Sequence, residues 1–112
     1  MIFQRGDVVQ VSLEPVVGSE IGKTRPSVVV QNDLANRSSP TLTIVPISSS
    51  TERAFPFQVR IPAGEGGLTR DSKALCEQIR TVARERLVRR IGQLPPERMK
   101  QIREALDRHL WF

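Results

Sequence analysis

Hydrophobic and polar side chains alternate along several short segments of the chain. In residues 7–13, apolar side chains at positions 9, 11 and 13 fall on one face of an extended chain, and mostly polar ones fall between them. This two-residue period predicts a half-buried strand. Alternation also predicts strands over residues 55–61 and 72–82. Nearly continuous apolar runs predict strands over residues 27–31 and 42–47, and residues 87–94 are predicted to form a short final strand.

Turn-forming residues separate these strands. Residues 15–25 carry two glycines and several polar groups, which predicts a long mobile loop. Residues 32–41, 48–51 and 63–67 are rich in residues that favour turns. Pro46 is expected to end or bulge its strand, because proline cannot donate a ladder hydrogen bond. With no repeat, linker or low-complexity segment, residues 1–112 are predicted to form a single domain.

The period changes near the C-terminus. Met99, Ile102, Leu106 and Leu110 recur at helical spacing, and two prolines stand where a helix start tolerates them. Short strands followed by one amphipathic helix predict a mainly β fold with α. The expected architecture is a small SH3-like barrel of antiparallel strands with a C-terminal amphipathic helix.

Charge adds an expectation about partners. The chain has 17 Lys and Arg against 12 Asp and Glu, a net charge of +5. An excess of positive charge, carried mostly by arginine, favours anionic partners such as nucleic acid. The N-terminus lacks the apolar core of a secretory signal, so a cytoplasmic location is expected. The longest apolar runs are too short to span a membrane, so no membrane partner is expected.

Several enzyme classes find no support in the sequence. Cys76 is the only cysteine, which precludes an intrachain disulfide and a cysteine-based metal site; we expect a buried side chain. His109 is the only histidine and is expected on the helix surface. The aspartates are scattered, and no metal-binding or phosphate-loop motif is present, so neither a metal nor a cofactor is expected.

Arg25 and Ser48 form the remaining candidate site. If strand 27–31 pairs antiparallel with strand 42–47, the start of the first lies near the end of the second. Arg25 and Ser48 then share one rim, where a cation and a hydroxyl can hold a phosphate and stabilise a pentavalent transition state. RNA would supply its own nucleophile, the 2′-hydroxyl. The alternative from these residues alone is that Arg25 is a solvated strand end and Ser48 an ordinary turn residue.

The sequence also resembles a known family. The matching stretches are RGDVVQVSLEPVVGSE at 5–20, KTRPSVVVQND at 23–33, NRSSPTLTIVPIS at 36–48 and GLTRDSKALCEQIRTVARERL at 67–87. Together they cover nearly the whole chain, in order and at family spacing. On these motifs the chain resembles the MazF/PemK/Kid toxin endoribonucleases of bacterial toxin–antitoxin systems.

The resemblance implies a homodimer that cuts single-stranded RNA, often mRNA, at a short sequence and so inhibits translation and growth. The cut needs no metal. The 2′-hydroxyl attacks, leaving a 2′,3′-cyclic phosphate and a 5′-hydroxyl. The resemblance also implies a cognate antitoxin whose acidic tail lies across the RNA groove, and binding of that tail is expected to displace or disorder the loop over residues 15–25.

Site residues follow from the same motifs. By KTRP, Arg25 takes the family's catalytic arginine role in proton transfer and phosphate stabilisation. Ser48 stands where the family usually has threonine, and it retains the hydroxyl. The resemblance implies RNA-binding roles for Arg5, Ser19, Glu20, Lys23 and Gln78. Without the resemblance, Glu20 reads equally well as a solvated loop charge and Gln78 as a structural or dimer contact.

Two other functions use similar features. Gyrase-poisoning toxins of the CcdB type share the barrel and act through the end of the last helix, where this chain has Trp111 and Phe112. They do not need Arg25 with Ser48. The other alternative is a non-catalytic RNA-binding barrel that uses arginines and exposed aromatic rings. The phenylalanines of this chain are expected in the core.

Overall fold

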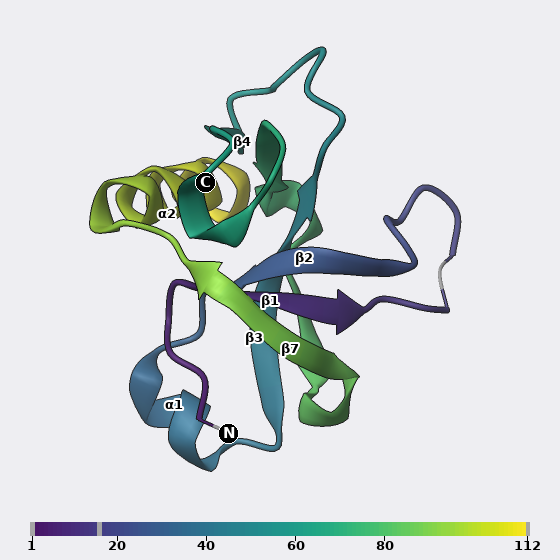
Figure 1. Cartoon of the computed structure of the whole chain (residues 1–112), viewed down its shortest axis with the longest axis vertical. Coiled ribbons are helices and arrows are strands. Elements are labelled where there is room, and N and C mark those ends of the chain that lie inside the picture. The colour runs from purple at the N-terminus through teal and green to yellow at the C-terminus, as the bar shows by residue number, and fades with distance from the viewer. Residues whose placement is uncertain (1, 16, 112) are drawn as a thin grey trace.

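Antiparallel strands and a long C-terminal helix make up the computed structural model, which describes residues 2–15 and 17–111 (Figure 1). In this described part, seven strands join in one sheet, and the C-terminal helix packs against its core. The predicted class is therefore confirmed. The strands are β1 (Asp7–Ser12), β2 (Thr24–Val29), β3 (Thr41–Ser48), β4 (Gln58–Ile61), β5 (Ser72–Leu75), β6 (Arg80–Ala83) and β7 (Leu87–Gln93); the helices are α1 (Asp33–Ser38) and α2 (Pro96–Leu110); and the 3₁₀ turns are η1 (Glu65–Gly67), η2 (Cys76–Gln78) and η3 (Arg84–Arg86).

The sheet is organised around β3. Its strands follow the order β4-β5-β3-β2-β1-β7, and β6 pairs with β3 outside this path. Along one edge β3 pairs with β2; along the other it pairs first with β6 and then, at Ile47 and Ser48, with β5. The segment 72–82, predicted as one strand, is therefore two. The turn η2 separates them and redirects the chain along β3.

The bounds of β2 and β3 differ from those predicted. β2 begins at Thr24, so Arg25 lies within the strand, paired with Val11, and not in the preceding loop. β3 continues through Pro46 without ending there. Pro46 falls between the β6 pairs, which end at Ile44, and the β5 pairs, which begin at Ile47. Its missing N–H group therefore falls where β3 changes neighbours along that edge.

The segment 32–41, predicted as turns, contains the short helix α1. The Asn32 side chain caps this helix by accepting a hydrogen bond from the N–H of Ala35 at 2.8 Å. Asn36 is buried, and its amide donates to the carbonyl oxygen of Gln31 at 3.0 Å. Six residues are too few for a helical period to stand out in the sequence, and a cap with side-chain hydrogen bonds stabilises the helix instead.

The prediction that the phenylalanines lie in the core is wrong for Phe55. Phe3 is buried, but Phe55 is 39% exposed. β4 begins only at Gln58, and the rings of Phe55 and Phe57 stack on each other before it, with centroids 5.4 Å apart. The alternation over 55–61 is therefore part strand and part surface stack. Phe112 lies outside the described residues.

Buried apolar side chains form two clusters, because both faces of the sheet are partly covered. One joins the sheet to α2 and includes Val28, Ile47 and Ile102; the other includes Val29 and Ile44. Alternate residues of β2 and β3 thus point to opposite clusters. No helix in the described part is long and apolar enough to cross a membrane.

The single cysteine and histidine lie where predicted. Cys76 is fully buried, and burial, with a smaller effect from the Glu77 charge, raises the pKa of its thiol to about 12. A thiol that stays protonated is a poor nucleophile. His109 is exposed near the end of α2.

Candidate functional site

Strand pairing brings Arg25 and Ser48 to one rim of the sheet. β2 and β3 are antiparallel, with Ser27 opposite Pro46. Continuing this register by two residues places Arg25 opposite Ser48, the last residue of β3. Residues directly opposite each other in an antiparallel pair point to the same face. The structure therefore shows the antiparallel pairing that the sequence predicted, with both residues on one face.

The guanidinium of Arg25 has no carboxylate partner among the described residues. Its Nε donates to the carbonyl oxygen of Gly22 at 3.2 Å, which fixes the side chain without neutralising its charge. The ion pairs in the described part join other residues, namely Arg90 with Asp7 and Arg98 with Glu65. A half-buried cation held only by a carbonyl can attract an anion to this rim.

Ser48 is buried, and its hydroxyl oxygen accepts a hydrogen bond from the N–H of Ser50 at 3.1 Å. A serine hydroxyl also has one proton to donate, which this contact leaves unused. Beside the rim, Arg25 lines a hollow of about 130 Å³ together with Ser49, Thr69 and Arg70, among others, whereas Ser48 does not line it. Arg70, which sequence reasoning missed, adds an exposed cation beside the half-buried Arg25.

Three of the predicted RNA-binding residues meet at a second hollow. Ser19, Glu20 and Gln78 all line a space of about 520 Å³ between the β1–β2 loop and η2. The side-chain oxygen of Gln78 accepts a hydrogen bond from the N–H of Ile21 at 2.9 Å, which ties the loop to η2. The amide nitrogen of Gln78 remains available to an incoming ligand.

The β1–β2 loop, predicted to be mobile, is held by its own carboxylates. Glu20 accepts from the N–H of Val17 at 2.7 Å, and Glu14 accepts from the N–H of Lys23 at 2.6 Å. Lys23 has a φ of +66° and an exposed side chain. It lies at the end of the loop and does not line the 520 Å³ hollow.

Glu77 is another residue of this hollow that the sequence analysis did not select. One carboxylate oxygen, Oε2, accepts from the Gln58 side-chain amide at 2.8 Å. The other, Oε1, is buried and has no hydrogen-bond partner within residues 2–15 and 17–111. A glutamate next to Gln78 could have been considered from the sequence, but the burial of its Oε1 atom could not have been predicted.

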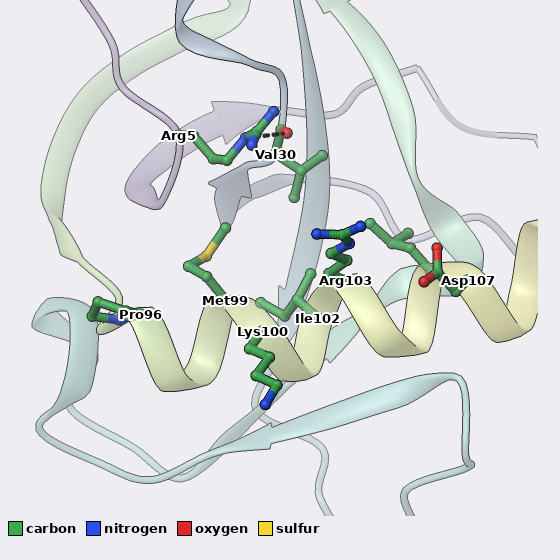
Figure 2. A pocket seen from close by; sticks show the side chains of 9 residues that line it. Arg5, Val30, Pro96, Met99, Lys100, Ile102, Arg103 and Asp107 are labelled. Carbon is green, nitrogen blue, oxygen red and sulfur yellow. Dashed lines mark hydrogen bonds between the residues drawn. The ribbon is translucent and has the colours of Figure 1, made fainter.

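Arg5 lies away from the other predicted RNA-binding residues. Figure 2 shows Arg5 and Val30 facing α2, with Met99 and Arg103 projecting toward them from the helix. These side chains line a hollow of about 530 Å³. The Nε of Arg5 donates to the carbonyl oxygen of Val30 at 3.1 Å. Its backbone N–H donates to Asp33, which lowers the pKa of that carboxyl group. Within one chain, Arg5 therefore belongs to a separate hollow.

The described residues contain no group of three or more His, Cys, Asp or Glu side chains that could hold a metal ion. At the rim, the side chains named above offer cations, from Arg25 and Arg70, and a hydroxyl group, from Ser48. Such groups bind phosphate and stabilise negative charge.

Comparison with solved structures identifies the fold. The crystal structure of MazF (Form-I) from Deinococcus radiodurans superposes with a TM-score of 0.87 at 23% identity, covering 100% of this chain and 99% of that one. An endoribonuclease in complex with its cognate antitoxin, from a Mycobacterial species, gives a TM-score of 0.79 at 23% identity, covering 96% and 93%.

Comparison of sequences extends this to the family. Endoribonuclease EndoA of Bacillus subtilis is 47% identical over 108 residues, 96% of this chain and 93% of EndoA. Endoribonuclease MazF9 of Mycobacterium tuberculosis is 44% identical over 114 residues, 97% of each chain. A family model described as PemK-like, MazF-like toxin of type II toxin-antitoxin system matches residues 4–110. The family match and these identities show that the chain belongs to the PemK-like, MazF-like toxins of type II toxin–antitoxin systems, as its motifs implied.

Proposed function

We propose that this chain, as one toxin domain over residues 1–112, cuts single-stranded RNA at the rim that carries Arg25 and Ser48. The endoribonuclease class follows from the family and from relatives that are named endoribonucleases. The placement of the cut is carried by one observation. The β2–β3 register, continued by two residues, sets Arg25 opposite the Ser48 hydroxyl, and this arginine has no carboxylate partner among the residues that the structure describes.

The proposed reaction uses a nucleophile from the RNA. The 2′-hydroxyl gives up its proton as its oxygen attacks the neighbouring phosphorus. The bond from phosphorus to the 5′-oxygen breaks and that oxygen takes up a proton, so the products carry a 2′,3′-cyclic phosphate and a 5′-hydroxyl with no net gain or loss of protons. The transition state carries more negative charge on the phosphoryl oxygens than the substrate does. Arg25 stabilises that charge, and the Ser48 hydroxyl donates a hydrogen bond to the same group. This route requires no metal ion.

RNA on either side of the cut bond has further contacts in this proposal. Ser19, Glu20 and Gln78 present hydrogen-bonding groups around the 520 Å³ hollow, which suits the edges of unstacked bases. Lys23 is an exposed cation at the end of the same loop. We assign Arg5 to RNA contact from the family motif, at the more distant hollow beside α2.

Partners follow from charge and from the family. We propose a cytoplasmic homodimer that is inhibited by a cognate antitoxin with an acidic tail. The net charge of +5 favours such a tail, since opposite potentials speed and orient association. Structural neighbours include a complex of an endoribonuclease with its cognate antitoxin and MazE-MazF of Deinococcus radiodurans.

The gyrase-directed alternative is less well supported. Trp111 is 84% exposed at the end of α2, as that alternative needs, and Phe112 lies outside the described residues. The relatives at 39–47% identity are nevertheless named endoribonucleases. The non-catalytic alternative is disfavoured for the same reason.

The test is to incubate the purified chain with a long single-stranded RNA in excess EDTA and to map the fragment ends. Discrete cuts that end in 2′,3′-cyclic phosphate, and that disappear in Arg25→Ala, are the expected result. Intact RNA across several unrelated sequences would contradict the proposal and place gyrase binding or RNA binding without cleavage first.

A further inference from the structure

We propose that a row of side chains leads RNA from the Arg25–Ser48 rim across β5 and β4 to a stacking surface made by Arg53 and Phe55. This inference rests on the proposed function and adds a second RNA subsite to it. The subsite is assigned to the backbone and one base of the nucleotides beside the cut bond.

The row is set by strand register. Ser48 lies opposite Lys73 on β5, and Lys73 lies opposite Arg60 on β4. With Arg25 opposite Ser48, four neighbouring strands each place one polar side chain in line on one face. The neighbouring positions in these strands, such as Ala74, belong to the buried core, so the row faces away from that core.

The two cations of this row hold the β3–β4 loop. The Nζ of Lys73 donates to the carbonyl oxygen of Arg53 at 2.6 Å. The Nη1 of Arg60 donates to the carbonyl oxygen of Thr51 at 2.9 Å. A lysine has three N–H groups and an arginine five, so both retain donors for a phosphate after these contacts. The loop that follows Ser48 is therefore fixed by the same side chains that extend the rim.

This loop presents a stack of planar groups. The guanidinium carbon of Arg53 lies 4.7 Å from the centre of the Phe55 ring, and Phe55 stacks on Phe57 with ring planes inclined by 1°. Phe57 in turn contacts His109 of α2, at 6.3 Å between ring centres. Arg108 of the same helix donates to the carbonyl oxygen of Pro56 at 3.4 Å. The inner end of the stack is thus supported by α2, while Arg53 and Phe55 stay exposed.

Single-stranded RNA fits this surface by shape and charge. Unstacked bases pack on aromatic rings and on guanidinium planes, whereas phosphates need cations beside them. Lys73, Arg60 and Arg53 supply the cations. The nearby carboxylate of Glu52 accepts from the Ser50 hydroxyl at 2.8 Å, which lowers the pKa of Glu52 and engages it within the loop. Continuity with Ser48 connects this surface to the proposed site of cleavage.

The experiment compares RNAs of different length. Once the cut sequence is mapped, kcat/KM is measured for a minimal RNA with that sequence and for RNAs extended on the 5′ side or the 3′ side. We expect wild type to cut one extended RNA faster than the minimal RNA. Phe55→Ala and Arg53→Gln should each remove about 10-fold of that advantage and leave the minimal RNA unaffected. Phe55→Trp, which keeps an aromatic plane, should preserve it.

Binding supplies a second measurement. An extended RNA with a 2′-deoxy group at the cut position binds without being cleaved. Its affinity is measured against salt concentration for wild type, Lys73→Gln and Arg60→Gln. The slope of log affinity against log salt is negative, and each variant should make it shallower by about 0.7, the value for one phosphate contact with a single strand.

Matched controls come from α1, which lies at the bottom of the view in Figure 1, whereas the β3–β4 loop lies at the top. Leu34 is 77% exposed and Arg37 is exposed, so Leu34→Ala and Arg37→Gln remove comparable groups elsewhere. They should change neither the length dependence nor the salt slope. Thermal unfolding of each variant checks its fold, and Phe55→Leu tests loss of the ring with most of the apolar volume kept.

Three outcomes would overturn the inference while leaving the proposed function intact. One is equal loss on minimal and extended RNAs. Another is wild-type behaviour of Phe55→Ala and Phe55→Leu on every RNA. The third comes from measuring the affinity of the same variants for a synthetic acidic peptide: weaker peptide binding with unchanged RNA binding and cleavage would assign the surface to a protein partner. Failure of wild type to cut any RNA would instead contradict the proposed function itself.

Discussion

Two arginines of this toxin differ in their partners. Arg98 donates from Nε and Nη2 to the two carboxylate oxygens of Glu65, at 2.9 and 2.7 Å. Arg25 donates from Nε to the carbonyl oxygen of Gly22 and has no carboxylate partner among the described residues. The charge of Arg98 is neutralised within the fold, whereas the charge of Arg25 stays available to an anion.

The packing is also closer around the Arg98–Glu65 pair than around Arg25. Near Glu65, the glycines of η1 and β7 approach so closely that a side-chain carbon on Gly67 would lie 2.5 Å from the carbonyl oxygen of Ile91. Around Arg25 lie exposed residues and a hollow of about 130 Å³. The comparison teaches that the Glu65 corner neutralises its charges in close packing, whereas the Arg25 rim leaves its cation beside a hollow, as the proposed binding site requires.

Among the changes that test this comparison, we expect the largest effect on the free energy of unfolding from a substitution at Gly67. Gly67→Ala should lower the free energy of unfolding by about 3 kcal/mol, because it adds a backbone clash to a φ of +77°. Gly64→Ala is the control, since Gly64 has a φ of +95° but nothing within 4 Å of the added carbon. It should lose only about 1 kcal/mol. Equal losses in urea unfolding would show that close packing does not distinguish this corner.

A smaller effect, on rate, is expected at Ser48. Ser48→Ala removes the hydroxyl and should slow RNA cleavage roughly 30-fold, about 2 kcal/mol for one hydrogen bond to a charged group. Ser48→Thr keeps the hydroxyl and should remain close to wild type. Single-turnover rates give the comparison. A fully active Ser48→Ala would remove Ser48 from the chemistry and leave it only its contact with the N–H of Ser50.

The smallest effect is expected from the charge of Glu65. Hydrogen bonding to Arg98 lowers the pKa of Glu65 in the folded chain below its ordinary value of 4.5. The ion pair therefore stabilises the fold at neutral pH, and that stabilisation is lost as pH falls through the lowered value. Glu65→Gln should lose about 1 kcal/mol at pH 7, since the pair is partly exposed to solvent.

The check is urea unfolding of wild type and Glu65→Gln across the acidic range. The gap between the two should close as pH falls below 4.5. A gap that stays constant with pH would show that the bidentate pair contributes by packing and not by charge. The Arg25 rim should not share this pH dependence, because it has no carboxylate partner in the described part of the chain.

Much of this fold could be predicted because the hydrophobic pattern of its main strands and of its long helix continues over the whole element. The alternation in β1 and the helical spacing in α2 each persist through the element, and the order of β2 and β3 predicted their pairing. The helix α1 was missed because six residues show no period. η2 was missed because alternation continues through residues whose backbone turns.

The candidate site could be predicted only in part. Strand order suggested that Arg25 and Ser48 share a rim, and motifs suggested the residues that line the second hollow. The row through Lys73 and Arg60 depends on the exact pairing of β3, β5 and β4, which alternation does not reveal. The exposure of Phe55 was likewise hidden, because its alternating neighbours resemble a strand.

The most direct test measures Arg25→Ala and Arg98→Ala side by side, with single-turnover RNA cleavage in excess EDTA and the free energy of unfolding for each. Arg25→Ala should lose about 100- to 1,000-fold in rate, as expected for removal of one group that stabilises transition-state charge. Its stability should stay within about 0.5 kcal/mol of wild type. Arg98→Ala should lose stability and keep its rate. Wild-type cleavage by Arg25→Ala, or a loss of activity explained by unfolding, would contradict the account.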